Sequence, residues 1–258
     1  MNDAWLRALV ALPFGLVLGS FMTVVVARVP AGESLVRPRS RCPHCGTPIA
    51  PRDNLPVVSW LLLRGRCRHC SEPISAGYPL LEAATGMLVA AGAARFSDLG
   101  AAIVVPAMLS MMPAVALIDL RHRIIPNRLM YPSLIAFPVA IVLARLLGSD
   151  LDPVKGLIGM LAYGGGLLLV AFVSRGMGMG DVKLTALLGL VLGSLSLRFV
   201  AVAAAAGILV GGLAGIGALL AGRSRKSAIP FGPAIVVGAV VAVFAGEAIA
   251  DWYLGRVG

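Results

Sequence analysis

The sequence predicts an all-α polytopic membrane protein with about eight transmembrane helices and a small zinc-ribbon-like insert between the first and the second. Of the 258 residues, 59% are hydrophobic and only 13% are charged, whereas a soluble domain is charged at about a quarter of its positions. The mean hydropathy is +0.92. Apolar stretches long enough to cross a bilayer recur along the chain, which argues against a soluble globular domain.

The apolar stretches are separated by charged residues, prolines and glycines, which mark where each helix is expected to end. The segment Met1–Trp5 has no basic region and the stretch after it is long enough to span, so no cleavable secretion signal is predicted. The predicted spans cover residues 5–27, 79–95, 99–119, 128–147, 154–174, 182–197, 199–221 and 230–250.

One long polar segment, residues 29–78, follows the first span and contains all four cysteines. They form two C-x2-C pairs, Cys42 with Cys45 and Cys67 with Cys70, which can supply four thiolates to one structural Zn²⁺. Disulfides are the alternative, and His44 or His69 could replace a cysteine as a ligand. The predicted parts are a first helix (1–28), a zinc-binding cytoplasmic insert (29–78) and a seven-helix membrane domain (79–258).

The basic residues predict an orientation in the bilayer. If residues 29–78 are cytoplasmic, sixteen of the 22 Lys and Arg lie on that side, which is the side where they normally accumulate. They include Arg175, Arg223, Arg225 and Lys226. The net charge of +10 is thereby explained by lipid-bilayer topology, and no nucleic-acid partner is predicted.

Two aspartates are the candidate catalytic residues. Asp119 closes the apolar run that starts at Val104, and Asp181 follows a glycine-rich run and opens another apolar run. A carboxylate at the edge of the hydrocarbon is costly, so it is a functional candidate by default. The orientation puts both at the cytoplasmic ends of their spans. Two neighbouring carboxylates share a proton, which is the arrangement that aspartyl hydrolysis needs.

The glycines before Asp181 suggest an active-site loop. Gly178 and Gly180 permit positive φ and close backbone approach, so an extended substrate could lie beside Asp181. The alternative for each aspartate is a helix-end residue paired with a cation, and for Asp119 the candidates are Arg121, Arg123 and Lys183.

Small residues recur on one face of two predicted helices, Gly15-x3-Gly19 and Gly207-x3-Gly211-x3-Gly215. Such faces let helices approach closely. Packing within the bundle is the favoured reading, and homo-oligomerisation is the alternative.

Together these motifs resemble a known family. Gly178-x-Gly180-Asp181 with Asp119 is similar to the GxGD-type membrane aspartyl proteases, and the cysteine pairs narrow the resemblance to the bacterial type IV prepilin peptidases/N-methyltransferases. The same order of motifs runs along most of the chain: Gly19-Ser20-Phe21, Asp53 to Leu61, Arg64 to Cys67, Tyr78-Pro79-Leu80-Leu81-Glu82, Ile125-Pro126-Asn127 and Ile229 to Pro233.

The resemblance implies an enzyme of the bacterial cytoplasmic membrane. It would cut the basic leader from prepilins and pseudopilins after a glycine, at the cytoplasmic face. It would then transfer a methyl group from S-adenosylmethionine to the new N-terminal amine, usually that of a phenylalanine. Asp119 and Asp181 would be the catalytic pair and the four cysteines the zinc ligands. No fingerprint for the methyl donor is present, so its site is not assigned.

One position departs from the family pattern: Thr23 stands where the family commonly has an asparagine. This concerns methyl transfer more than cleavage, so a peptidase without methyltransferase activity is the first alternative. Alternatives of another class are a membrane transporter and a structural subunit of a secretion system.

Overall fold

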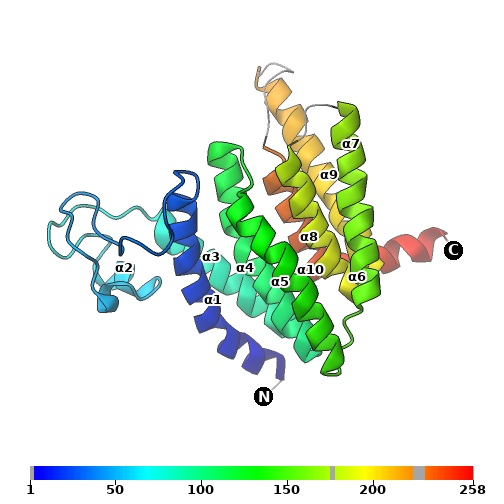
Figure 1. Cartoon of the computed structure of the whole chain (residues 1–258), viewed down its shortest axis with the longest axis horizontal. Coiled ribbons are helices and arrows are strands. Elements are labelled where there is room, and N and C mark those ends of the chain that lie inside the picture. The colour runs from blue at the N-terminus through cyan, green and yellow to red at the C-terminus, as the bar shows by residue number, and fades with distance from the viewer. Residues whose placement is uncertain (1–2, 175–177, 223–229, 258) are drawn as a thin grey trace.

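The computed structural model describes residues 3–174, 178–222 and 230–257, and within them the protein is all-helical, with two isolated β-bridges and no strand. Figure 1 shows a bundle of long helices with the insert at one side. The elements are α1 (Asp3–Arg28), η1 (Pro51–Asp53), α2 (Val58–Leu62), α3 (Gly77–Arg95), α4 (Leu99–His122), α5 (Asn127–Leu146), α6 (Pro153–Met160), η2 (Leu161–Gly165), α7 (Gly166–Ser174), α8 (Met179–Leu195), α9 (Leu197–Leu220) and α10 (Gly232–Val257).

The predicted all-α polytopic architecture is confirmed. Each of the eight predicted spans corresponds to a long helix, and α6, η2 and α7 together form one of them, with a π-helical turn in the middle. Six of these helices are long and apolar enough to cross a membrane: α1, α4, α5, α6–α7, α9 and α10. The remaining two are α3, which carries Glu82, and α8, which has 17 residues.

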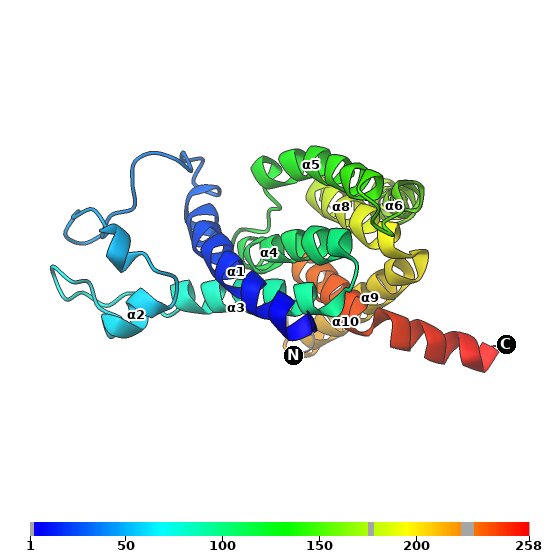
Figure 2. The same ribbon diagram turned by 90° about the horizontal axis from the view of Figure 1, so that it is seen from below.

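Several helix boundaries differ from the prediction, and α4 ends at His122, three residues past its predicted end. Helix α8 begins at Met179, three residues before the predicted span, so Asp181 lies inside its first turn. Helix α10 continues to Val257, past the predicted end at 250, and Figure 2 shows its last part projecting away from the bundle. Hydropathy ended the predicted spans at charged residues, but backbone hydrogen bonding continues a helix through them.

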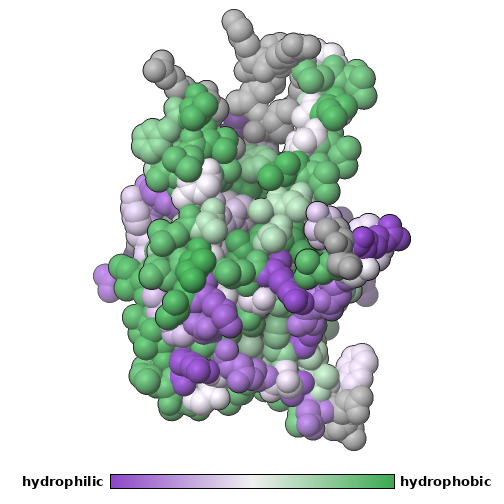
Figure 3. Space-filling model, turned by 90° about the vertical axis from the view of Figure 1, so that its right-hand side faces the viewer, coloured by the Kyte–Doolittle hydropathy of each residue, from purple (hydrophilic) through white to green (hydrophobic). Residues whose placement is uncertain are grey.

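Helices α4 and α8 form the centre of the bundle. Most of their residues are buried, and they pack against each other and against α5, α6 and α10. The outside of the bundle is apolar instead: large exposed side chains include Leu169 and Phe172 of α7 and Ile208 and Leu209 of α9. Figure 3 shows broad hydrophobic areas on one side of the molecule. An apolar surface of this extent fits contact with lipid.

Close helix approach occurs at glycines. Gly15 and Gly19 of α1 face α3, where an added Cβ would come within 2.7 Å of Val89 and 2.8 Å of Glu82. Gly159 of α6 and Gly189 of α8 face each other in the same way. The first of the two predicted small-residue faces therefore packs within the bundle. The second does so in part, because Gly211 contacts Phe231 but Gly215 has no neighbour within 4 Å.

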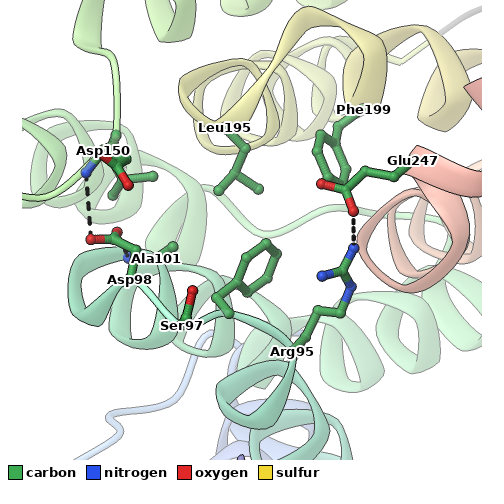
Figure 4. A pocket seen from close by; sticks show the side chains of 10 residues that line it. Arg95, Ser97, Asp98, Ala101, Asp150, Leu195, Phe199 and Glu247 are labelled. Atoms are coloured by element: carbon green, nitrogen blue, oxygen red, sulfur yellow. Dashed lines mark hydrogen bonds and ion pairs between the residues drawn. The ribbon is translucent and has the colours of Figure 1, made fainter. Parts of the chain in front are cut away.

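A polar cluster joins three connections at the end of the bundle where α4 begins. Asp98 caps α4 by accepting a hydrogen bond from the Ala101 amide at 2.8 Å, and it also accepts one from the Ser149 hydroxyl at 2.6 Å. Nearby, Arg95 forms an ion pair with Glu247. Figure 4 shows Arg95, Asp98, Ala101 and Glu247 around a cavity, whose volume is about 250 Å³. The cluster lies at the opposite end of α4 from Asp119 and holds the helix ends together.

Candidate active site

Asp119 lies in the last turn of α4 and is 5% exposed. The helix ends directly after it, at Arg123, which adopts the left-handed conformation (φ 56°) and donates its backbone N–H to the Asp119 carbonyl at 2.8 Å. The chain then turns through Ile125 and Pro126 into α5. This sharp turn keeps the carboxylate at the end of the bundle rather than at the middle of a span.

Asp181 lies in the first turn of α8. Helices α4 and α8 pack against each other, and the two carboxyl groups are near enough for their charges to interact. Figure 1 shows the end of α4 and the start of α8 at the same end of the bundle. The structure therefore brings Asp119 and Asp181 together, as the sequence predicts, while their catalytic roles stay a prediction.

Gly232, the first residue of α10, contacts Asp119 directly. Its backbone N–H donates to Asp119 Oδ2 at 2.9 Å, and a Cβ at this position would lie 2.6 Å from the same oxygen. The start of a helix favours a negative charge, so this contact orients and stabilises the carboxylate. Sequence reasoning did not assign Gly232 to the site. The sequence signal that could have identified this residue is the Pro230-Phe231-Gly232-Pro233 motif, to which the sequence assigns no function.

The two glycines before Asp181 act differently from the prediction. Gly178 has φ −74° and Gly180 is helical, so neither needs positive φ. A Cβ on Gly180 would lie 2.9 Å from the Ile125 Cβ, so this glycine lets α8 pack against the connection after Asp119. Among the described residues, the nearest atom to a Cβ on Gly178 would be Asp181 Oδ2 at 3.8 Å, an ordinary contact distance.

The alternative partners of the aspartates make other contacts. Lys183 donates hydrogen bonds to Asn127 Oδ1 at 2.8 Å and to the Tyr131 hydroxyl at 2.9 Å, and its ammonium lies 4.5 Å from the centre of the Tyr131 ring. Among residues 3–174, 178–222 and 230–257, no ion pair involves Asp119 or Asp181. Arg175, Arg223, Arg225 and Lys226 lie outside the described residues. Lys183 thus ties the start of α8 to the start of α5.

The four cysteines form one cluster. Each pair lies in a small knuckle closed by a β-bridge, Arg41 with Pro48 and Arg66 with Pro73. The sulfur atoms all lie within 4.8 Å of one another, and all four thiols are free. His44 and His69 are not part of the group, so the predicted alternatives of disulfides and histidine ligands are not what this structure contains.

The cluster has the dimensions of a zinc site. Four sulfurs about 2.3 Å from a central zinc form a tetrahedron with edges of about 3.8 Å. The sulfurs of Cys42 and Cys70 are 3.8 Å apart. The donor set fits one structural Zn²⁺ held by Cys42, Cys45, Cys67 and Cys70.

The insert is attached to the membrane helices at the aspartate end. Arg128, in the first turn of α5, donates hydrogen bonds to the carbonyls of Glu33 at 2.7 Å and Gly32 at 3.3 Å. Inside the insert, Arg68 forms a two-pronged ion pair with Asp53, and this ion pair holds the pKa of Asp53 below its usual value. The contacts of Arg128 tie the start of the insert to the start of α5, next to the turn that follows Asp119.

Comparison with known proteins agrees with the arrangement of motifs. Residues 13–96 match the bacterial peptidase A24 N-terminal domain, and residues 106–216 match the type IV leader peptidase family. The chain is 36% identical to the prepilin leader peptidase/N-methyltransferase of Bacillus subtilis, over 93% of this chain and 95% of that protein. It is 34% identical to the protein of that name from Aeromonas hydrophila, over 97% and 94%.

A protein of the same name from Burkholderia pseudomallei is 35% identical, over 92% of this chain and 84% of that protein. No solved structure matches the chain. The chain belongs to the type IV leader peptidase family.

Proposed function

We propose that the chain is a bifunctional prepilin leader peptidase and N-methyltransferase, with Asp119 and Asp181 as its catalytic pair. The observation that carries the peptidase proposal is that these two aspartates, 62 positions apart in the sequence, lie in the last turn of α4 and the first turn of α8, two helices that pack against each other. The same activities are named in relatives that align along nearly the whole chain.

In the proposed mechanism, one carboxylate is ionised and the other is protonated. The ionised one takes a proton from a water molecule, whose oxygen attacks the carbonyl carbon of the scissile peptide bond. The protonated one donates a hydrogen bond to the carbonyl oxygen and stabilises the charge that develops there. Proton transfer to the departing amine completes hydrolysis. The Gly232 amide holds Asp119 in a fixed orientation during these steps.

The site acts at the cytoplasmic face of a bacterial inner membrane in this proposal. The support is the excess of Lys and Arg on that side. The substrates are prepilins and pseudopilins, cut after a glycine, whose apolar segments approach through the lipid. The first helix and the insert (1–78) accompany a seven-helix protease domain (79–258).

Two further components complete the proposal. Zinc on the four cysteines fixes the fold of residues 42–70, because an insert of this size buries too little apolar surface to be stable unaided. S-adenosylmethionine supplies the methyl group. Thr23, at the position that departs from the family pattern, bonds back to the Ser20 carbonyl at 2.7 Å and so makes no polar contact across to the insert.

Mass spectrometry of a prepilin incubated with purified enzyme and S-adenosylmethionine tests the proposal. Loss of the leader with a gain of one methyl, absent in Asp119→Asn and Asp181→Asn, supports both activities. Leader loss without the methyl supports the peptidase alone. No cleavage of several candidate prepilins by folded enzyme would favour a transporter or a structural subunit instead.

A further inference from the structure

A large cavity lies between the insert and the ends of α1 and α3, and no step described above uses it. Its volume is about 1250 Å³, compared with about 300–1000 Å³ for a typical small-molecule site. One wall is apolar and belongs to α1, through Val17, Phe21 and Val24. The opposite wall belongs to the insert and mixes charged side chains such as Arg68 with apolar ones such as Ile49 and Trp60. The space is sufficient for two reactants side by side.

Glu82 of α3 lines this cavity. It is 9% exposed, and its Oε2 accepts a hydrogen bond from the Val57 backbone amide at 2.7 Å. Val57 has φ 62°, a conformation that a β-branched residue rarely adopts. Gly19 of α1 permits this arrangement, because a Cβ there would lie 2.8 Å from the Glu82 Cα. Helix α1, the insert and α3 therefore all approach the Glu82 side chain closely.

The other oxygen of Glu82, Oε1, has no hydrogen-bond partner in the described part of the chain, and Glu82 forms no ion pair there. Of the basic side chains of the insert that line the cavity, Arg68 pairs with Asp53 and His44 lies 3.9 Å from Glu72. The other two, Arg41 and His69, form no side-chain hydrogen bond or ion pair in the described residues, and none of the four contacts Glu82. Arg28 donates to the carbonyls of Ser34 and Pro38. A carboxylate placed at the start of a membrane helix is costly unless it binds a cation.

We propose that Glu82 binds the α-amino group of the substrate after its leader has been removed, and that methyl transfer takes place in this cavity. The inference rests on the proposed function. The apolar wall of α1 is suited to the apolar first residue that the family resemblance implies for the mature substrate. The Glu82 carboxylate then contacts the α-amino group of that first residue. The charged side chains of the insert wall are available to bind the methyl donor.

Glu82 acts here as a positioning residue for the amine. The amine must be neutral to react, so the ammonium first gives one proton to water. The nitrogen lone pair then forms the new N–C bond while the S–C bond of the donor sulfonium breaks, and its electron pair stays on sulfur. The product nitrogen is a methylated ammonium, which can lose one proton to become a neutral amine. It leaves the site as part of the substrate.

Peptide binding in detergent tests this directly. Two synthetic peptides with the mature N-terminal sequence of a prepilin are compared, one with a free α-amine and one N-acetylated. We expect the wild-type protein to bind the free amine at least about tenfold more tightly, and Glu82→Gln to lose that preference. Glutamine keeps an oxygen that can accept the Val57 N–H, so the insert stays docked. Glu247→Gln, the same change outside the cavity, is the matched control and should keep the preference.

The same proteins are then assayed with prepilin and S-adenosylmethionine. The ratio of methylated to cleaved product should fall at least tenfold in Glu82→Gln, with a raised KM for the free-amine peptide. A raised KM for the donor alone would assign the carboxylate to the sulfonium and overturn the proposal. Equal loss of free and acetylated peptide binding, or a lowered melting temperature, would show that Glu82 only docks the insert.

The peptide preference is measured without turnover. If the wild type prefers the free amine but transfers no methyl group, the proposed methyltransferase activity fails while the amine site stands. If the wild type methylates but Glu82→Gln keeps the full preference for the free amine, the amine site fails while the activity stands.

Discussion

The first residue of α10 is bonded to the last turn of α4: the Gly232 amide donates a 2.9 Å hydrogen bond to Asp119 Oδ2. The two residues are 113 positions apart in sequence. The contact means that the position of one candidate catalytic carboxylate depends on how a distant helix packs.

Gly232→Ala should therefore disturb Asp119. The new Cβ would lie 2.6 Å from Oδ2 and 3.0 Å from Cγ, so the carboxylate must move. Because a displacement of about 1 Å can cost about a hundredfold in rate, we expect leader cleavage to fall by about that factor. Steady-state cleavage of a prepilin peptide measures it. Gly212→Ala is the control, because nothing lies within 4 Å of that Cβ, and equal rates in the two variants would contradict the prediction.

Gly178 and Gly180 should respond differently to alanine. At Gly180 the added Cβ would meet Ile125 at 2.9 Å, so Gly180→Ala should lower both the melting temperature and the cleavage rate. At Gly178 the nearest described atom would lie 3.8 Å from the added Cβ, an ordinary contact distance, so Gly178→Ala should leave the melting temperature unchanged and raise KM if the substrate backbone lies beside Asp181. Thermal unfolding and a substrate titration distinguish the two. A destabilised Gly178→Ala protein would argue against this division of roles.

Removal of zinc should loosen the insert before it affects chemistry. Each knuckle is small, and the cysteine cluster, together with the contact between His44 and Glu72, joins one knuckle to the other. After chelation, or in Cys42→Ser, we expect trypsin to cut rapidly at arginines between 37 and 68, and added Zn²⁺ to restore resistance to the chelated wild type.

His44→Ala is the matched control for zinc binding. It removes a potential ligand side chain from the same knuckle but leaves the four sulfurs in place. We expect it to retain one zinc per chain by elemental analysis and to resist trypsin. Loss of zinc in His44→Ala, or a protease-resistant insert without metal, would contradict the assignment of the four cysteines as the structural ligands.

Asp98 lies at the end of the bundle opposite the aspartate pair, and we expect it to make the free energy of unfolding depend on pH. Burial raises its pKa, but hydrogen bonds from the Ser149 hydroxyl and the amides of Ala101 and Asp150 outweigh that effect, so the pKa lies below the ordinary value of 3.8. A lowered folded-state pKa stabilises the protein above the ordinary value, and the contribution is lost as pH falls through the folded-state pKa.

Asp98→Asn tests this pH dependence. Its amide keeps a capping oxygen but cannot ionise. Loss of a charged cap typically costs about 1 kcal/mol, or a melting temperature lower by about 2–4 °C, at pH 7. The difference from wild type should close as the pH falls below 3.8. Asp150→Asn, a neighbouring carboxylate that accepts none of these bonds, should differ little from wild type across the range. A pH-independent gap for Asp98→Asn would contradict the prediction.

The sequence alone was sufficient for the eight helices and for the clustering of the cysteine pairs, and it pointed to Asp119 and Asp181, whose catalytic role stays a prediction. These are local signals: an apolar run long enough to span a bilayer forms a helix whatever its neighbours are, and two C-x2-C pairs have few other uses. The end of a helix was less predictable. Asp181 fell inside α8 and α10 ran on to Val257, because a helix continues through charged residues when its backbone bonds are satisfied.

Only the tertiary structure decided which residues surround those local features. Gly232 reaches Asp119 because α10 packs against α4, and Gly180 is glycine because α8 lies against Ile125. Glu82 faces a cavity because α1, α3 and the insert meet there. Each of these contacts joins segments far apart in the chain. Their geometry depends on the positions of packed helices to within about an ångström, which residue type and spacing do not specify.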